Sequence, residues 1–277
     1  MSETPIVARE KIIIDTDPGV DDVLAMLLAL SSAPEELEIE LISVTYGNVD
    51  VQNCLRNVVS LFHQVQKEIE WRRSKGLPEG FEVLKHKKPL VAVGAAEPLA
   101  DQMMMADFFH GIDGLGGIHS THAHLAPQDT WKELFVKTVK SSDPDEAALA
   151  REITGKEQTL FIPSQEPAHE EILRILRENE PDTVTILAIG PLTNLAITAA
   201  ADPETFLRAK EVAVMGGAIG EAGNVQQPSP SPRNSRFPCP PFLLIKQPQS
   251  PLRTLLNLRN QMTPVAGAPS AVSRHQT

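Results

Sequence analysis

Four carboxylates lie within the eight residues Asp-Thr-Asp-Pro-Gly-Val-Asp-Asp, numbered 15 to 22. An apolar run precedes them, and Pro-Gly in the middle predicts a turn between a strand and a helix. One or two acids at the start of a helix are common, because the helix dipole favours them. Four close carboxylates repel one another, and a hard divalent cation with oxygen ligands would offset that repulsion. The segment therefore indicates a metal or sugar site.

Two other kinds of acidic site have sequences similar to this segment. An EF-hand requires Glu at the twelfth loop position, and counting from Asp15 that position is Met26, so an EF-hand is excluded. A haloacid-dehalogenase-like phosphatase also begins with an apolar strand and Asp-x-Asp, which would make Asp15 the nucleophile. The adjacent Asp21-Asp22 pair does not belong to that pattern. The phosphatase stays open as an alternative.

The mid-chain histidines 119, 122 and 124 look like a zinc-binding tract. They lie in a polar segment without nearby acids or cysteines, so we interpret them as part of a solvated loop.

Four further segments follow in an order that, together with residues 15–22, is typical of one family. They are Thr-Tyr-Gly-Asn at 45–48, His-Gly-Ile-Asp-Gly-Leu-Gly at 110–116, Ile-Gly-Pro-Leu-Thr-Asn at 189–194, and Met-Gly-Gly at 215–217 with Gly-Asn at 223–224. Over about residues 11–224 the chain resembles the inosine–uridine-preferring nucleoside hydrolases. Each short segment alone is weak evidence for the family. Asn48 and Asn224, for example, lie beside glycines and could be turn residues.

The resemblance implies an N-glycosidase that splits the ribosyl–base bond of purine or pyrimidine nucleosides with a calcium-bound water. By the family's pattern, Asp17 and Asp22 are calcium ligands, and Asp17 is also the general base. The backbone carbonyl of Ile189 stands where the family uses a third ligand. Asp15 would support the calcium ligands without binding the metal itself.

The resemblance also implies which residues bind the nucleoside. Asp21, Asn48 and Asn224 would contact the ribose hydroxyls, and His110 is a further candidate for substrate binding. The transition state of such a reaction resembles an oxocarbenium ion, so a cluster of carboxylates beneath the anomeric carbon stabilises the developing positive charge.

The match ends where the composition changes. Residues 225–277 contain no Asp or Glu, and they hold six of the 25 Lys and Arg residues and ten of the 23 prolines. The family's later Asp ligand and the acid that protonates the leaving base have no counterpart there. We therefore expect an N-terminal extension at 1–10, a C-terminally incomplete hydrolase domain at 11–224 and a disordered tail at 225–277. Hydrolysis is expected to be impaired, and a non-catalytic ribose- and calcium-binding protein is a second alternative.

Strands and helices alternate along the first 224 residues. Strands are predicted at 11–15, 39–45, 90–93, 183–188 and 211–215, and helices at 21–30, 52–69, 170–177 and 193–201. The first helix is indicated by Val20, Leu24, Leu27 and Leu28 at helical spacing. This alternation predicts an α/β fold, an open and mostly parallel sheet with helices on both faces and a Rossmann-like core. Sites in such sheets form at the carboxyl ends of the strands.

Composition excludes several classes of protein. A net charge of −11 and a pI near 5.2 argue against a nucleic-acid binder. The two cysteines cannot form a disulfide framework, no secretory signal is recognisable, and no apolar run reaches the length of a membrane span. We expect a cytoplasmic protein that acts on a small nucleoside, without nucleic-acid or membrane partners. Homo-oligomers occur in the family, but the sequence specifies none.

Overall fold

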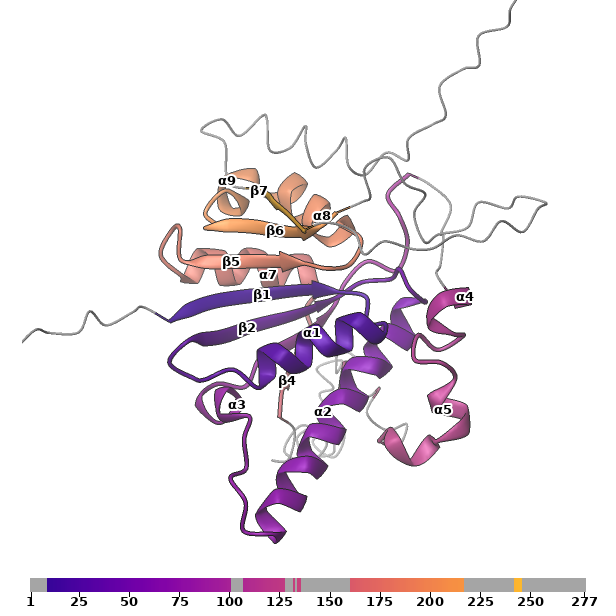
Figure 1. The fold of residues 1–277 in the computed structure, drawn as a ribbon. Coiled ribbons are helices and arrows are strands. Elements are labelled where there is room, and N and C mark those ends of the chain that lie inside the picture. Colours follow the sequence, from indigo (N-terminus) through magenta and orange to yellow (C-terminus); the bar gives the residue numbers. More distant parts are fainter. Residues whose placement is uncertain are drawn as a thin grey trace, which may run out of the picture.

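The computed structural model describes residues 9–100, 107–127, 132, 134–135 and 160–216, and the backbone of 242–245. Within this part of the chain the strands form one sheet in the order β4-β3-β2-β1-β5-β6-β7 (Figure 1). Every neighbouring pair is parallel except β6 and β7. The strands are β1 (Glu10–Thr16), β2 (Leu37–Val44), β3 (Leu90–Val93), β4 (Ile162–Pro163), β5 (Val184–Ala188), β6 (Glu211–Met215) and β7 (Phe242–Ile245).

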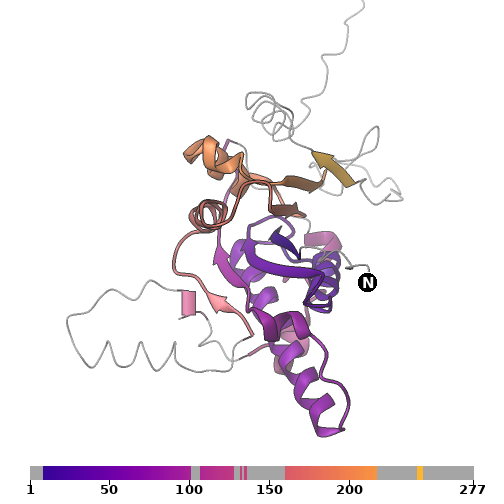
Figure 2. The same cartoon turned by 90° about the vertical axis from the view of Figure 1, so that its left-hand side faces the viewer.

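Helices cover both faces of the sheet (Figures 1 and 2). Because side chains alternate along a strand, Ile12 and Ile14 of β1 pack on one face and Ile13 on the other. The first face is covered by α1 (Val20–Leu30), α2 (Val51–Ser74) and α3 (Glu82–His86), and the second by α7 (Ala168–Glu178), α8 (Thr193–Ala201) and α9 (Pro203–Phe206). The short helices α4 (Asp107–His110), α5 (Ile118–Thr121) and η1 (Ala123–Leu125) follow β3 in the chain. The predicted α/β class is confirmed.

The five predicted strands and four predicted helices are all present, but α1 is oriented differently from what its apolar spacing suggested. Val20, Leu24 and Leu28 are exposed, with relative exposures of 52%, 62% and 73%. The packed face instead carries Met26 and Leu30. The helix is apolar around most of its circumference, so spacing alone does not select the face that packs.

Strand β7 was not predicted, because it lies in the tail expected to be disordered. Its Phe-Leu-Leu-Ile backbone pairs antiparallel with β6, with Met215 opposite Phe242 and Val212 opposite Ile245. An apolar stretch can add to an unpaired strand edge, and here it covers the edge of β6. The structure thus describes a strand at 242–245, residues 225–241 and 246–277 lie outside the described residues, and disorder of the tail stays a prediction.

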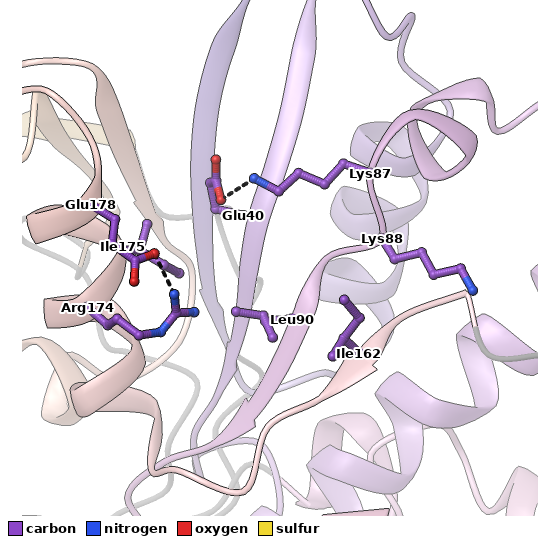
Figure 3. Close-up of a pocket in the computed structure, with 8 residues that line it drawn as sticks. All are labelled: Glu40, Lys87, Lys88, Leu90, Ile162, Arg174, Ile175 and Glu178. Carbon is purple, nitrogen blue, oxygen red and sulfur yellow. Dashed lines mark hydrogen bonds and ion pairs between the residues drawn. The ribbon is translucent and has the colours of Figure 1, made fainter. Parts of the chain in front are cut away.

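Charged side chains cluster on the amino-terminal half of β2. Lys87 Nζ donates to Glu38 Oε1 at 2.9 Å and to Glu40 Oε2 at 2.6 Å, and Arg9 Nη1 donates to Glu38 Oε2 at 2.9 Å. A cavity of about 420 Å³ opens beside this cluster, away from the carboxyl ends of the strands (Figure 3). It is lined by Glu40, Lys87, Lys88, Leu90, Ile162, Arg174, Ile175 and Glu178.

The Glu38 cluster predicts an acid-dependent loss of stability. Burial alone would raise the pKa of Glu38, but hydrogen bonds from Lys87 and Arg9 lower it from 4.5 to about 2. A lowered folded-state pKa contributes stability above about pH 4.5, and that stability is lost as the pH falls toward 2. Glu38→Gln should therefore lower the melting temperature at pH 7, and its difference from the natural chain should shrink below pH 4.5.

The control is Glu82→Gln, which removes an exposed carboxylate that pairs with Lys85 three residues along α3. It should change the melting temperature little at any pH. A Glu38→Gln deficit that stays constant between pH 7 and pH 3 would contradict this account.

Candidate functional site

The acidic turn follows β1, the strand at which the order of the sheet reverses. The chain runs outward from β1 through β2, β3 and β4, and then returns to β5 on the other side of β1. Loops leaving β1 and β5 diverge at such a switch point, and ligands bind there in open α/β sheets. Asp17 follows β1, Asn48 follows β2, and Ile189 follows β5. Three of the predicted segments are thus brought to one edge of the sheet.

Asn48 connects the two predicted metal ligands. Its backbone N–H donates to Asp17 Oδ2 at 2.7 Å, and its side-chain Nδ2 donates to the backbone oxygen of Asp17 at 2.9 Å. The same Nδ2 donates to Asp22 Oδ2 at 3.1 Å. Asn48 therefore holds the carboxylates of Asp17 and Asp22 on the same side of the turn.

Asp22 is also held by its own turn. Thr16 Oγ1 donates to Asp22 Oδ1 at 2.8 Å, and the backbone N–H of Gly19 donates to Oδ2 at 3.1 Å. Burial raises the pKa of Asp22 to about 6 despite these hydrogen bonds. Burial, together with the negative charge of Asp22, raises the pKa of Asp17 well above its ordinary value. A cation between the two carboxylates would favour the ionised form of both.

Asp15 lies behind the turn, fully buried. Strand register places it between Ser43 of β2 and Ala188 of β5. Its Oδ1 accepts from Ser43 Oγ at 2.5 Å and from Asn194 Nδ2 at 2.8 Å, and burial raises its pKa to about 6. A nucleophile must reach its substrate, so a carboxylate with 0% exposure argues against the phosphatase alternative.

Asp21 and His110 lie on the outer side of the turn. The Asp21 side chain is 61% exposed, and its Oδ1 is 4.0 Å from Nε2 of the buried His110. The backbone N–H of Val20 donates to His110 Nδ1 at 3.3 Å. Burial lowers the pKa of His110, although the charge of Asp21 acts in the opposite direction. Asn224, the remaining predicted substrate residue, lies outside the described residues.

Two glycines allow the strand ends to approach Asp17. A Cβ on Gly47, whose φ is +156°, would lie 2.1 Å from Asp17 Oδ2, and one on Gly190 would lie 2.9 Å from Asp17 Oδ1. Any side chain at either position would push the Asp17 carboxylate aside. The glycines of the Tyr-Gly-Asn and Ile-Gly-Pro segments therefore have a physical role at the site.

The donor set suits a hard cation in part. No group of three or more His, Cys, Asp or Glu side chains in the described residues is arranged to hold a metal. Asp17 and Asp22 nevertheless offer oxygen donors beside a tight turn, and within the same residues Asp15 Oδ2 and Thr45 Oγ1 are buried without a hydrogen-bond partner. Oxygen donors are those that calcium prefers. The residues fit a calcium site that takes two carboxylates from this turn.

Several residues around the turn were not predicted to take part. Thr16, Ser43 and Asn194 hold carboxylates, and Asn57 of α2 contacts the turn at Pro18. The interpretation of residues 119–124 as a solvated loop is wrong for His119, which is buried with Nε2 2.6 Å from Asn57 Oδ1. His122 and His124 are exposed as expected. The available signal was a polar Asn57 between apolar Leu55 and Val58 on the packed face of α2.

Comparison with known proteins identifies the family. The family model of inosine-uridine preferring nucleoside hydrolases matches residues 12–231. That match covers most of the 277 residues, so the chain belongs to the inosine-uridine preferring nucleoside hydrolase family. Among the described residues, no helix has both the length and the apolar character needed to span a membrane.

Relatives match over a similar region. Uridine nucleosidase 1 of Arabidopsis thaliana is 33% identical over 218 residues, which are 78% of this chain and 48% of that relative. Pyrimidine-specific ribonucleoside hydrolase RihA of Salmonella arizonae is 30% identical over 210 residues, 76% of this chain and 49% of that relative. The solved plant nucleoside hydrolase PpNRh1 is 27% identical, with a TM-score of 0.48 over 76% of this chain and 48% of that one. The chain spans about half the length of the curated relatives it matches.

The close approach of Gly47 to Asp17 predicts the effect of a single methyl group. Gly47→Ala should destabilise the chain more than Gly76→Ala, which also has a positive φ (+67°) but has nothing within 4 Å of its Cβ. Both variants place a side chain at positive φ, where backbone strain costs roughly 1–3 kcal/mol. Overlap with Asp17 should add about 1–3 kcal/mol at Gly47 only.

Chemical denaturation of the two variants and the natural chain measures this difference. Equal destabilisation by the two substitutions would contradict the packing of Gly47 against Asp17.

Proposed function

We propose that this chain is a ribonucleoside hydrolase that cleaves the ribosyl–base bond of purine or pyrimidine nucleosides with water. The observation that carries the proposal is the acidic turn at the switch point of the sheet, with Asn48 holding Asp17 and Asp22 side by side. Membership of the nucleoside hydrolase family supports it. A chain with a net charge of −11 is also better suited to a small nucleoside than to a nucleic acid.

Asp17 takes the proton of the attacking water in this proposal. Its backbone and side chain are both fixed by Asn48, so the carboxylate is oriented before substrate binds. Asp17, Asp22 and the backbone carbonyl of Ile189 would hold a calcium ion, which would supply positive charge for the water and the ribose hydroxyls. Asp22 is fixed by Thr16 and Gly19, and this keeps a second ligand in place.

Asp21, Asn48 and His110 face the ribose in this proposal. Asp21 is exposed at the outer side of the turn, and its carboxylate can accept a hydrogen bond from a ribose hydroxyl. As the bond to the base breaks, positive charge develops on the sugar, and the nearby carboxylates stabilise it. In the same proposal, Asn224 makes a further contact to the ribose hydroxyls, as the family's pattern implies.

Asp17 and Asp15 have different roles in this proposal, which predicts different losses of activity. Asp17→Asn should lower base release from inosine and uridine by about 10²–10⁴-fold, because it removes the general base. Asp15→Asn should lower it less, since the amide still fits between Ser43 and Asn194. Chromatographic release of free base measures both.

The same variants tested on an aryl phosphate provide the control. Phosphate release that depends on Asp15 more than on Asp17 would support the phosphatase alternative instead. Ribose-dependent calcium binding without any base release would favour the non-catalytic alternative.

Metal preference forms a separate prediction. Two buried carboxylates and a backbone carbonyl favour calcium over zinc, so calorimetry should detect calcium binding that Asp17→Asn abolishes. Glu82→Asn removes an exposed carboxylate from α3 and should leave calcium binding unchanged. Tight zinc binding that survives Asp17→Asn would overturn the assignment of this turn as a calcium site.

A further inference from the structure

One buried side chain on α2 joins two other segments of the chain. Asn57 has 0% exposure, and its Nδ2 donates to the backbone oxygen of Pro18 at 2.8 Å and to that of Asp113 at 2.9 Å. Its Oδ1 lies 2.6 Å from Nε2 of the buried His119. Both ends of the amide are thus used: one contact is to the acidic turn at Pro18, and the other two are to the segment from Asp113 to His119.

The segment that contains Asp113 is a closed loop. The Asp113 carboxylate accepts three backbone N–H groups, from Leu115 at 3.0 Å, Gly117 at 2.7 Å and His119 at 2.9 Å. Burial acts to raise the pKa of Asp113, but these three donors lower it. The loop therefore holds its own shape, and Asn57 determines where it lies relative to the rest of the molecule.

The loop and the acidic turn meet at two points. Asn57 holds Pro18 and Asp113 to one amide group, and His110 accepts from the backbone of Val20 on the far side of the turn. Pro18 is adjacent to Asp17 in the sequence. We therefore expect a displacement of Pro18 to disturb the Asp17 carboxylate, and a displacement of the loop to disturb His110.

The helix that carries Asn57 is suited to this role. Neighbouring side chains Leu55, Val58 and Phe62 are buried in the core between α2 and the sheet. Side chains on a packed helix are positioned more accurately than those on loops. A buried amide that lost its partners would also be unfavourable, so the three contacts form together.

We propose that Asn57 is a positioning residue of the site, which fixes the acidic turn against the His110 loop and so sets the distance between Asp17 and the bound ribose. This inference rests on the proposed nucleoside hydrolysis. Asn57 takes no part in the chemistry itself, and acts through Asp17 on one side and His110 on the other.

Asn57→Ala in the full chain tests the proposal, with Ser60→Ala as the matched control. Ser60 lies one turn further along α2, is buried, and among the described residues its Oγ has no hydrogen-bond partner. Asn57→Ala should lower kcat/KM for inosine by about 100-fold, with a raised KM as well as a lowered kcat, since misplacement of about 1 Å has such an effect. Ser60→Ala should leave both constants unchanged. An unchanged KM in Asn57→Ala, with kcat reduced only in proportion to the folded fraction, would overturn the proposal.

Amide hydrogen exchange provides a reading that does not depend on turnover. Asn57→Ala should speed exchange at Leu115, Gly117 and Gly19 by at least about tenfold, and leave the strand amides of β1 and β5 unchanged. Equal acceleration throughout the sheet would show global destabilisation and overturn the proposal. Absence of hydrolysis in the natural chain would defeat the proposed function, yet this exchange pattern would still decide whether Asn57 positions the turn.

A second pair of variants leaves Asn57 in place. Gly114 has φ +82°, and a Cβ there would lie 2.8 Å from Asn57 Nδ2, whereas Gly116 has φ +72° with nothing within 4 Å of its Cβ. Gly114→Ala should reproduce the exchange pattern and raised KM of Asn57→Ala. Gly116→Ala carries a similar backbone strain and should reproduce neither. Identical behaviour of the two glycine variants would contradict the role of Asn57.

Discussion

Mutual repulsion between buried carboxylates is the constraint on which the rest of this site depends. Asp17 and Asp22 are 5% and 2% exposed, and burial raises the pKa of each. Carboxylates brought so close must be held by other groups, and here Asn48, Thr16 and the backbone of Gly19 hold them. Each of these donors comes from the end of a strand or from the turn itself, so the sheet and the site form as one unit.

Strand order explains why these groups can meet. Strand β1 lies between β2, which comes next in the chain, and β5, which the chain reaches after β4. The acidic turn follows β1. The loops after β2 and β5 supply Gly47 and Gly190, which approach Asp17 closely because neither carries a Cβ. The position of the Asp17 carboxylate therefore depends on the absence of a side chain at these two positions.

The sequence predicted the sheet well, since strands buried on both faces are continuous apolar runs bounded by polar residues. Helix α2 was also predicted, and in the structure Val58, Phe62 and Val65 lie on its packed face. Spacing failed for α1, where Leu24 and Leu28 are exposed although they are apolar. The segment at 242–245 shows a different limit, because a four-residue strand depends on the β6 edge that it joins and has no period of its own.

The sequence predicted the parts of the site that form local patterns and missed the parts that depend on contacts between distant segments. Asp17, Asp22, Asn48 and Ile189 lie in short segments with recognisable spacing, so the sequence could indicate them. Asn57 and His119 meet across 62 residues, and each resembles an ordinary helix or loop residue when considered alone. The groups that would bind a ligand are thus visible in sequence as local patterns. The groups that hold them in place are not, because their effect arises only when distant segments pack together.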